Sequence, residues 1–170
     1  MQDVSPATSA EPLTATSPPR AFLARWRALQ AAPPAGARPI TVSITASFTI
    51  ELLLPYLGVL MSQRGLYPRF RVAPFNQIYQ ALLDPQGPLR GEGPADLTLV
   101  LPRLEDLCAG PLAQLRTLQP DAVAAAREGA RAEIGRLLDA LARYAQEGQG
   151  GALLCGTLPP PGSTPLGLLD

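Results

Sequence analysis

Histidine is absent from this chain of 170 residues, and lysine is absent as well. Without histidine, the chain alone cannot supply a Ser-His or Cys-His pair for nucleophilic catalysis, or an imidazole ligand for a metal. The 14 basic residues are all arginine, and they balance 14 acidic residues to give a net charge of zero. A neutral chain gives no reason to expect binding to nucleic acid or to an anionic membrane.

Cysteine is scarce, and long uninterrupted apolar runs are missing. Cys108 and Cys155 lack the spacing of a metal site, and their apolar settings predict two buried free thiols. The N-terminus has neither the basic nor the apolar region of a signal peptide. The most apolar window, residues 40–61, is interrupted by Glu51 and Pro55, which a membrane-spanning helix disfavours. We therefore expect a cytoplasmic protein.

The segment Pro39–Gly65 combines two hydrophobic periods. Apolar residues alternate over 40–45, which predicts a strand. Helical spacing follows, with one apolar face made of Ile50, Leu53, Leu54, Leu57 and Leu60. Thr49 is expected to cap the start of this helix and Gly65 its end. A strand, a turn and a helix form the first half of a βαβ unit, whose turn is where ligands bind in open α/β sheets.

The same patterns predict the rest of the chain as alternating helices and strands. Helices are expected at 20–31, 76–83 and 120–144, and strands at 69–72, 95–101 and 152–155. Buried positions are expected to include Leu23, Leu99, Val123 and Leu138. The order predicts an α/β three-layer sandwich with a mostly parallel sheet, SGNH-hydrolase-like or flavodoxin-like.

The composition also predicts domain limits. Residues 1–19 are expected to form a disordered leader, 20–38 a helix and linker, 39–156 the α/β domain, and 157–170 a proline-rich tail. Four strands are few for this class, so we expect an incomplete domain. The isolated 170 residues are then expected to be marginally stable or dependent on a partner, because an uncovered sheet edge invites pairing.

Residues that follow three of the predicted strands, all of them polar except Phe48, form a candidate ligand or partner site. They are Ser47, Phe48, Thr49, Asn76, Gln77, Tyr79, Glu105 and Asp106, with Gln80 beside them. Each group also has a structural interpretation: Ser47 and Thr49 cap a helix and close its turn, Tyr79 and Gln80 lie on the surface, and the acids favour a helix N-terminus. No glycine-rich phosphate loop and no D-x-D motif is present, so we assign no catalytic residue and no metal ligand.

Three blocks of the sequence resemble the N-terminal region of FkbH-like proteins, which form subfamily IIIC of the HAD superfamily. The blocks are SFTIELLLPYL, RVAPFNQIYQALLDPQGPL and PADLTLVLPRLEDL, and the closing PPPGSTPLGLLD resembles the segment that leads onward in those proteins. The resemblance implies a protein of polyketide and related biosynthesis that loads a glyceryl unit from 1,3-bisphosphoglycerate onto an acyl carrier protein. It places the catalytic aspartates and Mg²⁺ in a downstream HAD domain, and no cofactor in this chain.

The resemblance therefore implies a non-catalytic N-terminal module, with the acyl carrier protein or the HAD domain as its partner. Two alternatives stay open. Ser47 stands where an SGNH-type hydrolase or esterase carries its nucleophile, although its flanks read A-S-F-T instead of G-D-S and no histidine can activate it. The chain could also be a small-ligand-binding domain that uses the turns at 46–49 and 102–106.

Overall fold

A computed structural model describes residues 12–14, 16–91, 93–110, 120–147 and 151–157. The chain forms two compact units. A helical unit holds the described residues up to Pro39 together with Glu51–Pro68, and a sheet unit holds Ile40–Ile50 and the described residues from Arg69 onward. The predicted leader and proline-rich tail lie mostly outside the described residues, so the predicted domain limits stay predictions.

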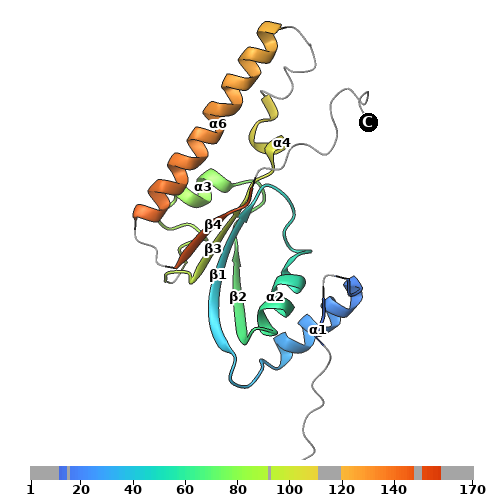
Figure 1. The fold of residues 1–170 in the computed structure, drawn as a ribbon. Coiled ribbons are helices and arrows are strands. Elements are labelled where there is room, and N and C mark those ends of the chain that lie inside the picture. Colours follow the sequence, from blue (N-terminus) through green and yellow to red (C-terminus); the bar gives the residue numbers. More distant parts are fainter. Residues whose placement is uncertain (1–11, 15, 92, 111–119, 148–150, 158–170) are drawn as a thin grey trace, which may run out of the picture. The chain divides into compact units, whose positions relative to one another are not determined.

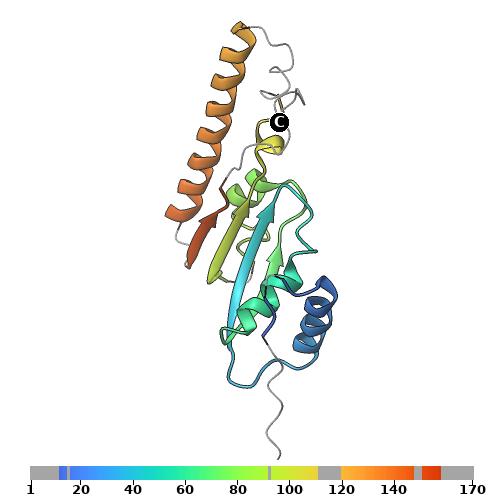
Figure 2. The same cartoon turned by 45° about the vertical axis from the view of Figure 1, so that its right-hand side comes forward.

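The four strands form one parallel sheet in the order β2-β1-β3-β4 (Figures 1 and 2). Their bounds are Arg38–Ala46 for β1, Leu66–Val72 for β2, Leu97–Leu101 for β3 and Ala152–Cys155 for β4. In the register, Ile44 of β1 lies beside Leu99 of β3, and Leu97 lies beside Ala152 of β4. The predicted α/β class with a mostly parallel sheet is confirmed, and the fold is consistent with a three-layer sandwich.

Two helices of the sheet unit, α3 (Ile78–Leu83) and α6 (Pro120–Gln146), pack against each other on one face of the sheet (Figure 1). A short helix, α4 (Leu104–Leu107), follows β3. Their shared core consists of Ala73, Ile78, Ala81, Leu82, Leu89, Val100, Leu137, Ala140, Leu141 and Tyr144. This core holds in place the turns at the carboxyl ends of the strands.

Three predicted core positions of the sheet unit are wrong. Val123 and Leu138 of α6 are 43% and 59% exposed, because the buried stripe follows residues 137, 140, 141 and 144. Leu138 lies about 100° around the helix from Leu137 and so falls outside that stripe. Leu99 is only half-buried, whereas its neighbours Thr98 and Val100 are buried, because adjacent strand residues point to opposite faces.

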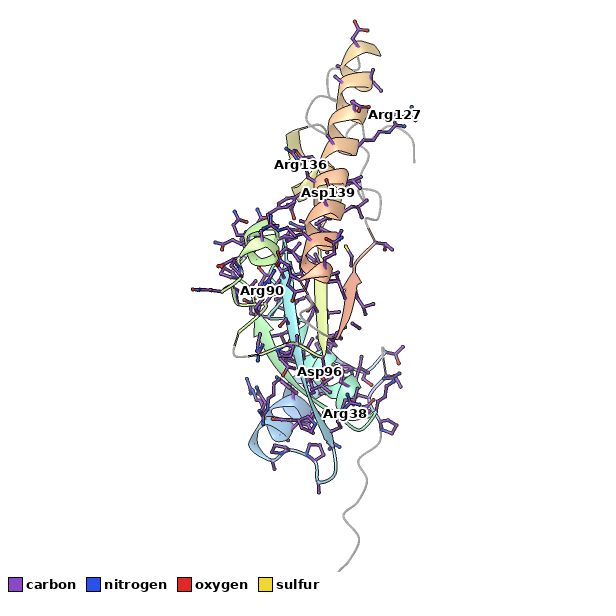
Figure 3. All side chains as sticks on the ribbon, turned by 90° about the vertical axis from the view of Figure 1, so that its left-hand side faces the viewer. Arg38, Arg90, Asp96, Arg127, Arg136 and Asp139 are labelled. Carbon is purple, nitrogen blue, oxygen red and sulfur yellow. The ribbon has the colours of Figure 1, made fainter. Side chains whose placement is uncertain are left out.

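The face of the sheet toward α6 is unusually polar. Ser43 donates a hydrogen bond to the backbone oxygen of Leu89 at 2.9 Å, and the hydroxyls of Thr98 and Tyr144 are 3.1 Å apart. Arg90 (labelled in Figure 3) is buried, pairs with Glu147 directly after α6 and stacks on the ring of Tyr144. These contacts tie the loop before β3 to the last turns of α6.

The helical unit contains α1 (Pro19–Ala31) and α2 (Leu54–Ser62), which pack together (Figure 1). The side chains of Phe22, Trp26 and Leu29 are buried, and the ring of Phe22 lies 4.5 Å from that of Tyr56 between centroids. Leu23, which the sequence placed in this core, is 44% exposed.

The start of α2 differs from the sequence prediction. Thr49 is exposed and does not cap the helix, which begins at Leu54 with Pro55 in its first turn, a position that suits proline. The buried face of α2 is therefore Pro55, Gly58 and Val59 instead of the leucine face expected from the sequence, and Leu53 is exposed. Gly65, after the helix, has the expected left-handed conformation with φ of 75°.

The two thiols also differ from each other. Cys108 is buried as expected, but Cys155, at the end of edge strand β4, is exposed. The expectation of two buried thiols is therefore wrong for Cys155. No helix in the described ranges combines the length and the apolar character that crossing a membrane would require.

Candidate functional site

A cleft of about 230 Å³ lies at the carboxyl ends of the first three strands of the sheet. The chain leaves β1 toward β2 on one side and leaves β3 toward β4 on the other, so the boundary between β1 and β3 is the topological switch point. Ligands of open α/β sheets bind at this point. We call it the switch-point cleft, and its lining residues are Ser47, Asn76, Ile78, Tyr79, Gln80, Pro102, Asp106 and Leu107.

Ser47 directly follows β1 and is only 2% exposed. Its backbone N–H donates to the oxygen of Leu101, and its hydroxyl accepts a hydrogen bond from the backbone N–H of Arg103 at 2.9 Å. The Ser47 hydroxyl also contributes to lowering the pKa of the Asp106 carboxyl. Ser47 therefore closes the turn between β3 and α4, and the interpretation that it caps the helix after β1 is wrong.

Asp106 is an ionised hydrogen-bond acceptor at the cleft. Its carboxylate receives a hydrogen bond from Nε of Arg103 at 2.8 Å. This bond and, to a smaller extent, the Ser47 hydroxyl hold the pKa of Asp106 below its ordinary value of 3.8, although partial burial acts in the opposite direction. The guanidinium of Arg103 also lies 5.8 Å from the ring centroid of Phe48, within range of a cation–π contact.

Asn76 occupies a conformation that few residues other than glycine adopt. Its φ is 55°, and its backbone N–H donates to the oxygen of Ala46 at 3.1 Å. Asparagine tolerates this left-handed region better than most residues. The turn brings the amide side chain of Asn76 to the cleft, one residue before the cap of α3.

Tyr79 forms another wall of the cleft. It is half-buried, and its hydroxyl donates to the backbone oxygen of Glu133 in α6 at 3.2 Å. Burial and, to a smaller extent, the charge of Glu133 raise the pKa of Tyr79. The ring is thus a neutral, anchored surface between α3 and α6.

The structure brings together about half of the residues predicted for the site. Ser47, Asn76, Tyr79 and Asp106 line the cleft with Gln80, and Phe48 reaches its edge through Arg103. The remaining predicted residues, Thr49, Gln77 and Glu105, are exposed and do not belong to the described lining.

Sequence reasoning included Arg103 and Pro102 only as members of the turn at 102–106 and gave them no role of their own, and it missed Ile78 and Leu107 as walls of the cleft. The spacing of Arg103 and Asp106, three residues apart at the start of a helix, was a usable signal for an ion pair. The contributions of Ile78, Pro102 and Leu107 had no comparable signal, because apolar residues in short helices and turns usually belong to the core.

The chemistry of the cleft favours binding over catalysis. An ionised carboxylate with a lowered pKa is a weak general base, and it does not turn a serine hydroxyl into a nucleophile at neutral pH. In the part of the chain that the structure describes, no three acidic or thiol side chains converge as metal ligands. The cleft instead offers two amide side chains, one carboxylate and an apolar wall.

Comparisons with known proteins show only the fold. No protein-family model matches the chain, and no curated protein matches it. A solved structure with a similar fold is the N-terminal part of the protein BF1531 from Bacteroides fragilis, which contains a phosphatase domain and is complexed with Mg. The TM-score is 0.53 at 14% identity, over 81% of this chain and 34% of that one. This chain therefore spans about a third of that structure and shares its α/β fold there.

Proposed function

We propose that this chain is the N-terminal, non-catalytic α/β module of an FkbH-like protein of HAD subfamily IIIC. In such a protein the downstream HAD domain, with its Mg²⁺, loads a glyceryl unit from 1,3-bisphosphoglycerate onto an acyl carrier protein. The module provides a binding surface, and the switch-point cleft is its ligand or partner site. Three sequence blocks and a fold similar to part of a phosphatase-domain protein support this proposal.

The observation that carries the non-catalytic role is the hydrogen bonding of Ser47. Its hydroxyl is buried and accepts a hydrogen bond from the backbone N–H of Arg103. An active serine needs a base that can accept its proton, and the chain contains no histidine. The position that would carry chemistry in an SGNH hydrolase here stabilises a turn.

An esterase assay tests this role directly. The chain and its Ser47→Ala variant are incubated with chromogenic esters of short acyl groups, and circular dichroism checks that both are folded. We expect hydrolysis at the buffer rate in both samples. Turnover in the parent chain that disappears in a folded Ser47→Ala variant would establish the hydrolase alternative instead.

The family assignment is tested separately at the level of the gene. A D-x-D-x-T motif encoded in frame after Asp170, or in an adjacent gene, would supply the HAD domain that the proposal requires. A genomic context with no such domain would count against the glyceryl-loading role and leave the cleft as the site of an unrelated binding module.

A further inference from the structure

Tyr79 separates the switch-point cleft from a second recess. This recess, which we call the arginine groove, has a volume of about 290 Å³ and runs between α3 and α6. Its lining residues are Tyr79, Leu83, Arg136, Asp139, Ala140 and Arg143. Each recess alone is smaller than a typical ligand site of roughly 300–1,000 Å³, whereas the two together fall within that range.

The arginine groove places two guanidinium groups beside an apolar floor. Arg136 and Arg143 are seven residues apart, which places them on one face of α6 about 10 Å from each other. Their side chains are 64% and 66% exposed. Leu83 and Ala140 supply apolar surface between them.

Acidic residues surround both arginines but leave them available. Arg136 pairs with Glu133 of the same helix and Arg143 with Glu147 directly after it, and Asp139 lies between the two arginines. The guanidinium ends are exposed, and ion pairs at such positions contribute little stability, so an anionic ligand can compete for these bonds at small cost. Glu147 keeps its second partner, the buried Arg90, when Arg143 turns to a ligand. Figure 3 shows Arg136 and Asp139 on the same part of α6.

The switch-point cleft has the opposite character. Its described lining contains no arginine, and the adjacent Arg103 is paired with Asp106. A phosphate group there would face the Asp106 carboxylate without a compensating cation. The amides of Asn76 and Gln80 and the carboxylate instead suit a neutral group that both donates and accepts hydrogen bonds, such as an amide or a hydroxyl.

We propose that the cleft and the groove form one bipartite site for an elongated phosphate ester with an amide-containing chain. The phosphate lies between Arg136 and Arg143, and the chain crosses Tyr79 to place its amides at Asn76 and Gln80. This inference rests on the proposed function in one respect, because the phosphopantetheine arm of a carrier protein has this chemistry. Free molecules that carry a phosphopantetheine group have the same chemistry.

A matched pair of probes tests the division of the site. The chain is titrated with 4′-phosphopantetheine and with pantetheine, which lacks only the phosphate, and binding is measured by calorimetry. We expect saturable binding of both, with the phosphorylated probe about tenfold tighter (about 1.4 kcal/mol), because its phosphate adds charge-assisted hydrogen bonds that pantetheine cannot make. Equal affinities, or no saturable binding of either probe, would overturn the proposal.

Variants locate the two ends of the ligand. The double variant Arg136→Gln/Arg143→Gln should remove the tenfold preference for the phosphorylated probe and leave pantetheine binding unchanged. The matched control is Arg127→Gln, an exposed arginine nearer the start of the same helix (Figure 3), which should change neither affinity. Gln80→Ala should weaken both probes equally. An Arg127→Gln effect as large as that of the double variant would show that binding is only non-specific charge attraction.

Carrier proteins with and without the arm distinguish the source of the ligand. Tighter binding of the arm-bearing form, with the same arginine dependence, supports both the bipartite site and the proposed function. Equal binding of the two forms would show that the arm is not the ligand and would overturn the bipartite site. The proposal that the chain docks a carrier protein would stand. Binding of the free probe with the expected arginine dependence, but of neither carrier protein, would uphold the site and contradict the carrier partner.

Discussion

The indole ring of Trp26 in α1 lies where a side chain at Gly58 of α2 would be. A Cβ added at Gly58 would overlap three carbons of that ring, all closer than atoms in contact can approach. The two helices therefore approach closely where the ring of Trp26 lies against Gly58, and this contact holds α1 against α2. Trp26 is the only tryptophan of the chain, and it is buried together with Phe22 and Leu29 of the same helix.

Gly58→Ala should destabilise the protein. Overpacking a close contact costs about 1–3 kcal/mol, which exceeds the gain of about 0.5–1 kcal/mol from replacing a helical glycine by alanine. Gly135→Ala in α6 is the matched control, because a Cβ there meets no atom within 4 Å. We expect opposite signs in chemical denaturation, with Gly135→Ala more stable than the parent. A Gly58→Ala variant as stable as Gly135→Ala would refute the packing of α1 on α2.

Thr98→Val and Thr45→Val should have different effects on the free energy of unfolding, although both threonines are buried in neighbouring strands. The hydroxyl of Thr98 hydrogen-bonds that of Tyr144, so its loss leaves a buried phenol unsatisfied and should cost about 1–3 kcal/mol. The hydroxyl of Thr45 has no partner among the described residues, so valine there should be neutral or stabilising. Urea denaturation of both variants measures the difference.

A double-mutant cycle isolates the contact between Thr98 and Tyr144. If the two hydroxyls interact, Tyr144→Phe in the Thr98→Val background should cost less than in the parent chain. Strictly additive effects would show that the costs come from packing instead of the hydrogen bond.

Asp106→Asn should remove an acid-sensitive part of the stability. The pKa of Asp106 is lowered in the folded state, mainly by Arg103, so the stabilisation is complete above its ordinary pKa of 3.8 and is lost as pH falls through the lower folded value. The difference in urea midpoint between the parent and Asp106→Asn should therefore be constant near neutrality and shrink below pH 3.8. Glu105→Gln, which removes the same charge from the exposed neighbouring position, is the control.

Nuclear magnetic resonance can follow the Asp106 carboxyl directly. Its titration midpoint should lie below 3.8 in the parent chain and move upward in Arg103→Gln, because the largest cause of the shift is then absent. A midpoint that does not respond to Arg103→Gln would contradict the pairing seen at the cleft.

Cys155 should react with a thiol reagent well before Cys108. Cys155 is exposed at the edge of the sheet, whereas Cys108 is fully buried beneath α6. Burial raises the pKa of both thiols, so the reaction of Cys155 should accelerate as pH rises above neutrality. Under native conditions we expect one reactive thiol per chain, and none in Cys155→Ser. A rapid second reaction would show that α6 opens readily.

Much of the secondary structure follows from local patterns in the sequence. Alternation over 40–45 and the apolar run at 95–101 predict β1 and β3, and a 3.6-residue period predicts α6, because each pattern depends only on neighbours along the chain. The order of these elements was enough to predict an α/β fold with a parallel sheet. The absence of histidine alone excluded a conventional catalytic triad.

The candidate site depended on tertiary structure. Ser47 and Arg103 are 56 residues apart, and they meet because β1 and β3 pair in parallel with Ala46 beside Leu101. Tyr79 lines two recesses only because α3 packs on α6. Helix period cannot tell which apolar residues are buried when several lie near one stripe, as Leu138 shows. Contacts between distant segments are set by register and packing, and these come from the simultaneous burial of many surfaces, which no local window of sequence contains.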